Sequence, residues 1–328
     1  MRIDPAIAAL RGDPAAGRPA QAAIERALAA WRREPAVAAA CAELAAYGEG
    51  GALARYPALA ALVEAREAAN AFVDPLLARV AGVLRRHPLA QLPFRHQAGE
   101  GVALLQLARA GRATLSLIGY DPAATRLAPR SVCFTDSHRH EICLAGSGRA
   151  QRVTLAAPTR GGAGLALADV ALAPGTRMDF AGARATKIVR QVQRSVVLLR
   201  LTRVARVPGE SREYRLSDGA LLHRAAGTAR ESRRELALAL LGRMARADAL
   251  PLMLDAARSG SDSARWQALR ECLALDSGAG FAALARIARD PADPLAGPAA
   301  ALRDDLLARH PVLAAAEGEG GGDRCPAR

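Results

Sequence analysis

The feature that most restricts the possible folds is a change in the spacing of apolar residues along the chain. Between about residues 91 and 215, short β-type runs replace the longer helical patterns on either side. Signals for turns, such as Asp121-Pro122, Gly146 to Gly148 and Pro174-Gly175, separate these runs. The runs are VALLQLA, ATLSLIGY, SVCFTD, HEICLAG, QRVTLAA, LALADVALA, TKIVRQV, SVVLLRLTRV and EYRLS. Many short strands at even spacing predict an antiparallel barrel or jelly roll, which we place at residues 90–226.

Residues 1–89 are predicted to form an N-terminal domain of four or five short helices. Apolar residues recur there at three- and four-residue spacing. Asp4-Pro5 and Asp74-Pro75 each place an N-cap acceptor before a proline suited to the first helical position. The glycines within residues 48–51 indicate a loop, and His87-Pro88 should end the last helix.

The region after the β-type runs is predicted to be helical again, over residues 227–316. Thr228 and Glu231 form a capping-box pattern ahead of a helix. A shift of 33 residues lays Ala268-Leu-Arg-Glu-Cys-Leu273 on Ala301-Leu-Arg-Asp-Asp-Leu306, which indicates an internal repeat. We expect residues 317–328 to form a disordered tail.

The repeat resembles the short HEAT-like repeat, in which an "ALPxL" helix precedes an "R..AL" helix. Ala249-Leu-Pro-Leu252 and Arg265-Trp-Gln-Ala-Leu269 carry the resemblance. The second copy departs from the pattern at Pro298. The resemblance implies protein–protein contact, so we expect a protein partner at this region.

The positive charge is concentrated in the β-type region. The formal net charge is +13, and Lys187 is the only lysine. Between Gln91 and Arg215, 19 basic residues face 8 acidic ones. Few aromatic residues are interleaved, so nucleic acid is not favoured, and an anionic small molecule or an acidic partner is the alternative to solvated arginines. Arg190 and Arg194 could share a strand face and are the candidate anion-binding residues.

The sequence favours a cytoplasmic protein with no membrane segment. Asp4 and Pro5 interrupt the apolar run that a signal peptide needs, and no run of about 18 apolar residues follows. The 5 cysteines form no CxxC pair, which fits reduced thiols. The motifs GxSxG, HExxH and the P-loop are absent from the sequence, so no covalent mechanism is indicated.

A histidine pair in FTDSHRHEICLAG is the strongest candidate for chemistry. On a strand, His138 and His140 would lie on the same face as Ile142 and Leu144, which we expect to be the inward face of the barrel. Two imidazoles at this spacing can reach one metal ion.

This stretch resembles the first motif of the cupin superfamily, HxH followed by a glutamate and a glycine. His138-Arg-His140 supplies its histidines and Gly146 or Gly148 its glycine, while Leu144 and Ala145 stand at the place of the glutamate. The second motif, PxG followed by a histidine, is represented by Pro174-Gly175, with Arg177-Met178 where the histidine belongs. The resemblance implies a cupin-like barrel that could hold iron, zinc, manganese or nickel.

Three interpretations of the histidines stay open. In the first, His96 or His223 completes a divalent metal site with His138 and His140. In the second, the pair only hydrogen-bonds within the barrel wall, and in the third it contacts an anionic ligand.

Two functions follow from these patterns. The first is a non-catalytic binding or regulatory protein, in which the helical repeat engages a protein partner and the basic barrel senses or docks an anionic ligand. The alternative is a metal-dependent cupin-type oxygenase or isomerase with His138 and His140 as metal ligands.

Overall fold

The computed structural model describes residues 5–122, 129–159 and 162–317. It is a mixture of helices and antiparallel strands, which confirms the predicted fold class at that level. Within these ranges, no helix is long and apolar enough to cross a membrane. Asp4 and all but the first residue of the predicted tail lie outside the described residues.

The chain divides into two compact units. The first consists of residues 1–206 and 213–222, and the second of residues 207–212 and 223–328. The domain boundary predicted at residue 89 falls inside the first unit. The predicted boundaries between the helical, β-rich and repeat domains therefore stay predictions.

The first unit begins with the predicted helices, which include five α-helices among the described residues. They are α1 (Pro5–Gly12), α2 (Arg18–Arg32), α3 (Pro35–Glu49), α4 (Pro57–Glu64) and α5 (Arg66–Arg86), with the 3-10 turns η1 (Pro14–Gly17) and η2 (Leu53–Arg55). Helix α5 ends at Arg86, as His87-Pro88 predicted.

Two predicted helix boundaries are wrong. Pro75 lies inside α5 rather than at a helix start, because Phe72, Val73 and Leu76 continue one buried face across it. Gly48 lies in the last turn of α3 instead of a loop. A Cβ on Gly48 would come within 2.7 Å of the carbonyl oxygen of Ala110, so this helix end sits directly against the sheet.

A seven-stranded antiparallel sheet of order β1-β2-β3-β8-β5-β6, with β7 paired to β5, forms most of the remaining first unit. Its strands are β1 (His96–Gly99), β2 (Val102–Ala110), β3 (Ala113–Tyr120), β5 (Ser137–Thr159), β6 (Gly162–Leu172), β7 (Arg177–Phe180) and β8 (Ala185–Val204). A second sheet has the order β10-β9-β4, with β4 (Ser131–Phe134), β9 (Ser211–Arg215) and β10 (Leu221–Ala225).

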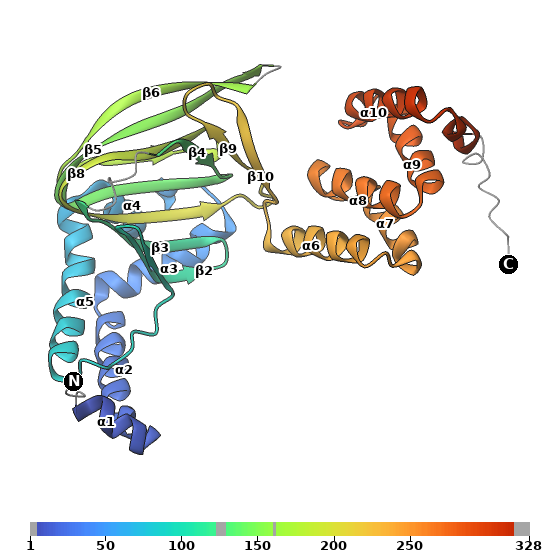
Figure 1. Ribbon diagram of the computed structural model, residues 1–328. Helices are drawn as coiled ribbons and strands as arrows, with labels where there is room; N and C mark the ends of the chain where they lie inside the picture. Colours follow the sequence, from blue (N-terminus) through green and yellow to red (C-terminus); the bar gives the residue numbers. More distant parts are fainter. Residues whose placement is uncertain (1–4, 123–128, 160–161, 318–328) are drawn as a thin grey trace. The chain divides into compact units, whose positions relative to one another are not determined.

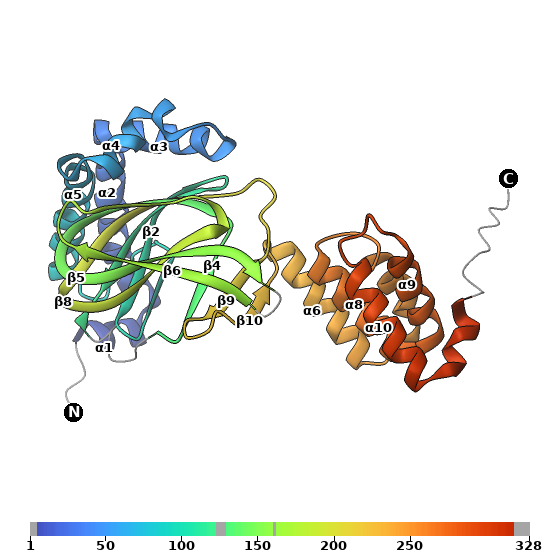
Figure 2. The same ribbon diagram turned by 90° about the horizontal axis from the view of Figure 1, so that it is seen from above.

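Strands β5 and β8 are each one long strand, where the sequence predicted two with a turn between them. Register shifts between Cys143 and Ala150 bend the paired strands instead of ending them. Gly146 has a φ of 93°, and a Cβ there would lie 2.1 Å from the carbonyl oxygen of Ser195. The bend therefore requires glycine and brings the two halves of each strand over one another (Figure 2).

The two faces of the curved sheet have separate cores. On the outer face, Leu115, Ile142, Leu199 and Leu201 pack with apolar residues of the N-terminal helices, which cover this face in Figure 1. On the inner face, the buried residues come from the sheet itself. They are Ile118, Cys143, Ala150, Leu172, Met178, Phe180, Ala185, Val192, Val196 and Leu198.

The second unit is built mainly of helices. They are α6 (Ala229–Arg243), α7 (Leu250–Ala256), α8 (Asp262–Leu275), α9 (Ser277–Arg289) and α10 (Ala296–Arg309), followed by the 3-10 helix η6 (Pro311–Glu317). The backbone N–H of Glu231 donates to Thr228 Oγ1 at 3.1 Å, which confirms the predicted cap. The helices share one apolar core that includes Met253, Leu269 and Phe281.

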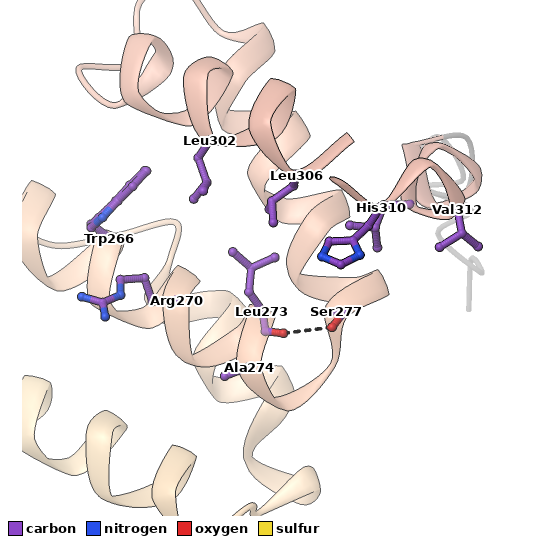
Figure 3. Close-up of a pocket in the computed structure, with 10 residues that line it drawn as sticks. Trp266, Arg270, Leu273, Ala274, Ser277, Leu302, Leu306, His310 and Val312 are labelled. Carbon is purple, nitrogen blue, oxygen red and sulfur yellow. Dashed lines mark hydrogen bonds between the residues drawn. The ribbon is translucent and has the colours of Figure 1, made fainter. Parts of the chain in front are cut away.

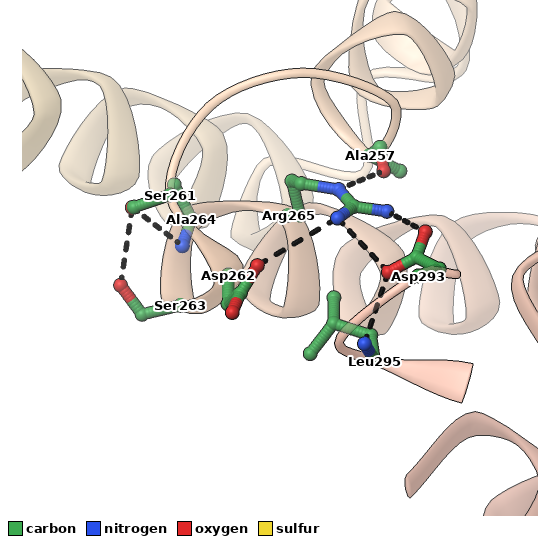
Figure 4. Close-up of polar contacts among 8 residues, drawn as sticks. All are labelled: Ala257, Ser261, Asp262, Ser263, Ala264, Arg265, Asp293 and Leu295. Atoms are coloured by element: carbon green, nitrogen blue, oxygen red, sulfur yellow. Dashed lines mark hydrogen bonds and ion pairs between the residues drawn. The ribbon is translucent and has the colours of Figure 1, made fainter. Parts of the chain in front are cut away.

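Arg265 of α8 joins the two predicted copies of the repeat (Figure 4). Its guanidinium makes a bidentate ion pair with Asp293, with Nη1 donating to Oδ1 at 3.1 Å, and its Nε donates to the carbonyl of Ala257 at 3.2 Å. Asp293 also accepts from the backbone N–H of Leu295 at 2.9 Å, just before α10. The pair fixes the loop that leads from α9 into α10.

Candidate functional site

The histidine pair lies on the outer face of the sheet, so the predicted inward orientation is wrong. His138 and His140 do share a face with Ile142 and Leu144, but this face packs against the N-terminal helices. The alternation along the strand was predicted correctly. The strand sequence alone could not predict which of its faces the helices cover, because those helices come from a distant part of the sequence.

Each histidine has a different neighbour. His140 Nδ1 lies 2.6 Å from Oδ1 of Asp179, which the adjacent strand β7 supplies. Partial burial, together with the positive charge of Arg203, lowers the pKa of His138. Both environments are compatible with histidines that pack within the sheet, and neither requires a metal.

The two further histidines of the predicted metal set lie on other strands, and His223 belongs to the second unit. His96 is in β1, with Nδ1 3.1 Å from the carbonyl oxygen of Phe94, and His223 is in the exposed strand β10. Among residues 5–122, 129–159 and 162–317, no group of three or more His, Cys, Asp or Glu side chains could hold a metal ion. The metal site stays a prediction, which metal analysis of untagged protein and of His138→Ala would test.

The predicted anion-binding pair also stays a prediction. Arg190 Nε donates to Gln151 Oε1 at 2.7 Å, and Gln151 in turn donates to Asp169 at 2.9 Å. Arg194 is exposed near the bend of β8. Arg190 is therefore already engaged by neighbouring strands.

An ion cluster lies on the inner face of the sheet, centred on Glu141. Glu141 is fully buried and Lys187 is 3% exposed. Glu141 Oε1 accepts from Arg200 Nε at 2.6 Å, and Oε2 accepts from Lys187 Nζ. Strand register places Arg200 opposite Glu141, whereas Lys187 comes from the other half of the bent strand β8.

The charges of this cluster control each other's ionisation. Burial alone would raise the pKa of Glu141, but Lys187 and Arg200 together lower it to about 2. Burial lowers the pKa of Lys187 to about 8, with Arg200 acting in the same direction and Glu141 opposing it. Glu141 is ionised at neutral pH, so it cannot serve there as a proton donor.

Arg139 completes the inner cluster. Its Nη2 donates to the carbonyl of Ala185 at 3.1 Å, and its guanidinium lies 5.0 Å from the centre of the Phe180 ring. Its Nε is buried without a hydrogen-bond partner. Burial, followed by the charge of Arg200, lowers the pKa of Arg139.

The alternation of residues along the strand already pointed to this cluster, although the interpretation of the sequence concentrated on the histidines of the opposite face. Strand alternation placed Arg139, Glu141 and Cys143 on one face, opposite the histidines. A glutamate and an arginine two residues apart on a buried strand require partners inside the fold. The partners themselves depend on distant pairing, because Arg200 follows from the register of β5 with β8 and Lys187 from the bend in β8.

A groove of about 800 Å³ opens on the second unit between α8 and α10 (Figure 3). Its apolar lining includes Trp266, Leu273, Leu302 and Leu306, and Val312 at its end is 80% exposed. The leucines of the two helices point toward one another across the groove.

The ionisable side chains at the groove are an arginine and a histidine. Arg270 and His310 belong to its lining, and no carboxylate does among the described residues. Arg270 is exposed and makes no ion pair or hydrogen bond with another residue in the described part of the chain. The groove therefore combines an apolar floor with an unneutralised positive edge.

Comparison with known proteins adds a weak likeness. No family model matches the chain, and no curated protein matches it. The solved structures similar to it include cupin domains. A cupin-2 domain from Rhodospirillum rubrum is 14% identical, with a TM-score of 0.25, and the match covers 36% of this chain and 76% of that one.

Two further structures match at the same level. The CENP-C cupin domain of Drosophila melanogaster is 12% identical over 33% of this chain and 74% of that one, with a TM-score of 0.25. The 7S globulin of Momordica charantia is 12% identical over 38% of this chain, with a TM-score of 0.26. The match spans only 36% of the globulin's own length.

Proposed function

We propose that this chain is a non-catalytic, cytoplasmic binding protein. A HEAT-like helical repeat engages a protein partner through the groove between α8 and α10. A cupin-like barrel docks a small anionic ligand. The observation that carries the proposal is the open apolar groove, which exposes side chains of a kind that partners commonly cover.

The shape of the groove suits an amphipathic helix of the partner. Trp266, Leu273, Leu302 and Leu306 are each only partly buried, although they come from two packed helices. A helix inserts apolar residues three and four positions apart into such a groove. Tryptophan is also enriched among residues that contribute most to binding energy.

The charge of the groove further restricts the partner. Because Arg270 forms no ion pair within the described part of the chain, a carboxylate on the partner helix would pair with it and gain specificity. We therefore expect a helix with apolar anchors and at least one aspartate or glutamate beside them.

Selection of a random 16-residue peptide library on the full-length protein tests this. Enriched peptides should carry apolar residues at helical spacing with a nearby acid, and they should alter the fluorescence of Trp266. Arg270→Glu should weaken their binding by about tenfold, equivalent to about 1.4 kcal/mol. Arg286→Glu is the matched control, because Arg286 is exposed on α9 outside the groove lining.

Three outcomes would contradict the proposal. One is that no peptides are enriched, and another is that enriched peptides bind Arg270→Glu and Arg286→Glu equally well. The third is self-association of the free protein through this groove, detected by sedimentation and abolished by Leu306→Asp. That result would assign the groove to a second copy of the chain.

A further inference from the structure

The barrel interior holds more positive than negative charge. Glu141 is the one carboxylate paired with the cations of the inner cluster among the described residues. Both of its oxygens are used, one by Lys187 and one by Arg200. Arg139 is near enough to influence the ionisation of Glu141, Lys187 and Tyr120, yet it forms no ion pair with a carboxylate of the described residues. The cluster therefore contains three cations and one anion.

Such an imbalance is costly in a folded interior. A buried charge without a counter-charge destabilises a protein, because water no longer solvates it. Arg139 is a group of this kind, because its buried Nε has no hydrogen-bond partner. The guanidinium is nevertheless held in position by the carbonyl of Ala185 and the ring of Phe180. It is thus fixed in place with one donor still free.

We propose that the barrel interior binds a small oxyanion, a carboxylate or phosphate group, between Arg139 and Arg200. Guanidinium groups recognise these anions through paired N–H donors. The Arg200 side chain is 18% exposed, so the cluster is not sealed from solvent. This inference rests on the ligand-binding half of the proposed function. It moves the ligand from Arg190 and Arg194 to the inner face of the sheet.

The other groups of the cluster determine which anions the site prefers. Lys187 and Tyr120 lie beside each other, with Lys187 Nζ 5.8 Å from the ring centre, and the positive charge of Arg200 opposes the rise that burial causes in the pKa of Tyr120. Glu141 stands at the centre and repels a second negative charge placed against it. The site should therefore prefer a compact anion with one acidic group over a larger polyanion.

Thermal unfolding of the full chain tests the inference. Trp266→Phe leaves Trp31, buried in the core of the first unit, as the single tryptophan reporter. Sodium acetate, sodium phosphate and sodium chloride are titrated at equal ionic strength. Acetate, phosphate or both should raise the unfolding midpoint progressively with concentration, as ligand linkage requires, while chloride should not. Comparing acetate with phosphate identifies the preferred oxyanion.

Two substitutions connect the response to the site. Arg139→Gln should weaken the apparent affinity by more than about tenfold, because it removes the guanidinium that has no counter-charge. Without added anion, this variant should unfold no earlier than the parent protein, since an uncompensated charge has gone. Arg109→Gln, at an exposed arginine of β2, is the matched control and should keep the full response.

The inference is overturned if neither oxyanion changes the midpoint, or if chloride acts as strongly as both. It is also overturned if Arg139→Gln responds like the parent. If Arg139→Gln does not fold, Lys187→Met is measured instead. An unchanged shift of the unfolding midpoint with the oxyanions in Lys187→Met would also contradict the site. None of these results alters peptide binding at the groove in the second unit, so the two proposals can fail separately.

Discussion

Replacing Glu141 by glutamine tests the energetics of the inner cluster most directly. The change keeps the shape of the side chain but leaves Lys187 and Arg200 without their carboxylate. The pKa of Glu141 falls from 4.5 to about 2 in the folded protein. At about 1.36 kcal/mol per unit, this corresponds to roughly 3 kcal/mol of stability at pH 7. Breaking a buried ion pair costs about 3–5 kcal/mol, which agrees.

Urea unfolding followed by Trp31 fluorescence in the Trp266→Phe background measures this loss. Because the pKa of Glu141 is lowered on folding, its contribution is complete above pH 4.5 and disappears as the pH falls toward 2. The parent should therefore lose stability across that window through this group, and Glu141→Gln should lack this component. Adding Lys187→Met to Glu141→Gln should recover much of the loss at pH 7. A loss below about 1 kcal/mol in the single variant would refute the reasoning.

Two further predictions concern the second unit, and urea unfolding of each variant and its control checks both. Gly280→Ala should destabilise this unit by about 2 kcal/mol or more, because the new Cβ would lie 2.5 Å from the backbone nitrogen of Leu273. Gly297→Ala is the control, because no atom lies within 4 Å of the added Cβ in its helix, and it should be neutral or stabilising. An equal loss of unfolding free energy in both glycine variants would contradict the close contact at Gly280. Arg265→Ala should cost about 1–3 kcal/mol through its bidentate pair, whereas Arg258→Ala, at an exposed pair, should cost less than about 1 kcal/mol. Similar losses in these two arginine variants would show that burial does not strengthen the pair.

Local signals in the sequence predicted much of the fold. Strand β3 has the bounds of the run ATLSLIGY, and Thr228 caps α6 as its side chain requires. His87-Pro88 ends α5, because a residue before proline disfavours the helical conformation. Each of these features depends on residues within a few positions, so one sequence is enough to find it.

Features that depend on distant contacts could not be predicted in this way. Pro75 looked like a helix start, yet a continuous buried face carries α5 across it. Gly146 looked like a turn, yet its positive φ bends a strand that stays paired. The face that holds the histidines was reversed because helices from the first 86 residues cover it.

The shared core of helices and sheet has a practical consequence for dissecting the protein. The change of sequence pattern near residue 89 invites a truncation there. Such a fragment would leave Leu115, Ile142, Leu199 and Leu201 as an uncovered apolar surface on the sheet. An exposed surface of this kind favours aggregation. The sheet should thus be obtained in pure form only together with the N-terminal helices.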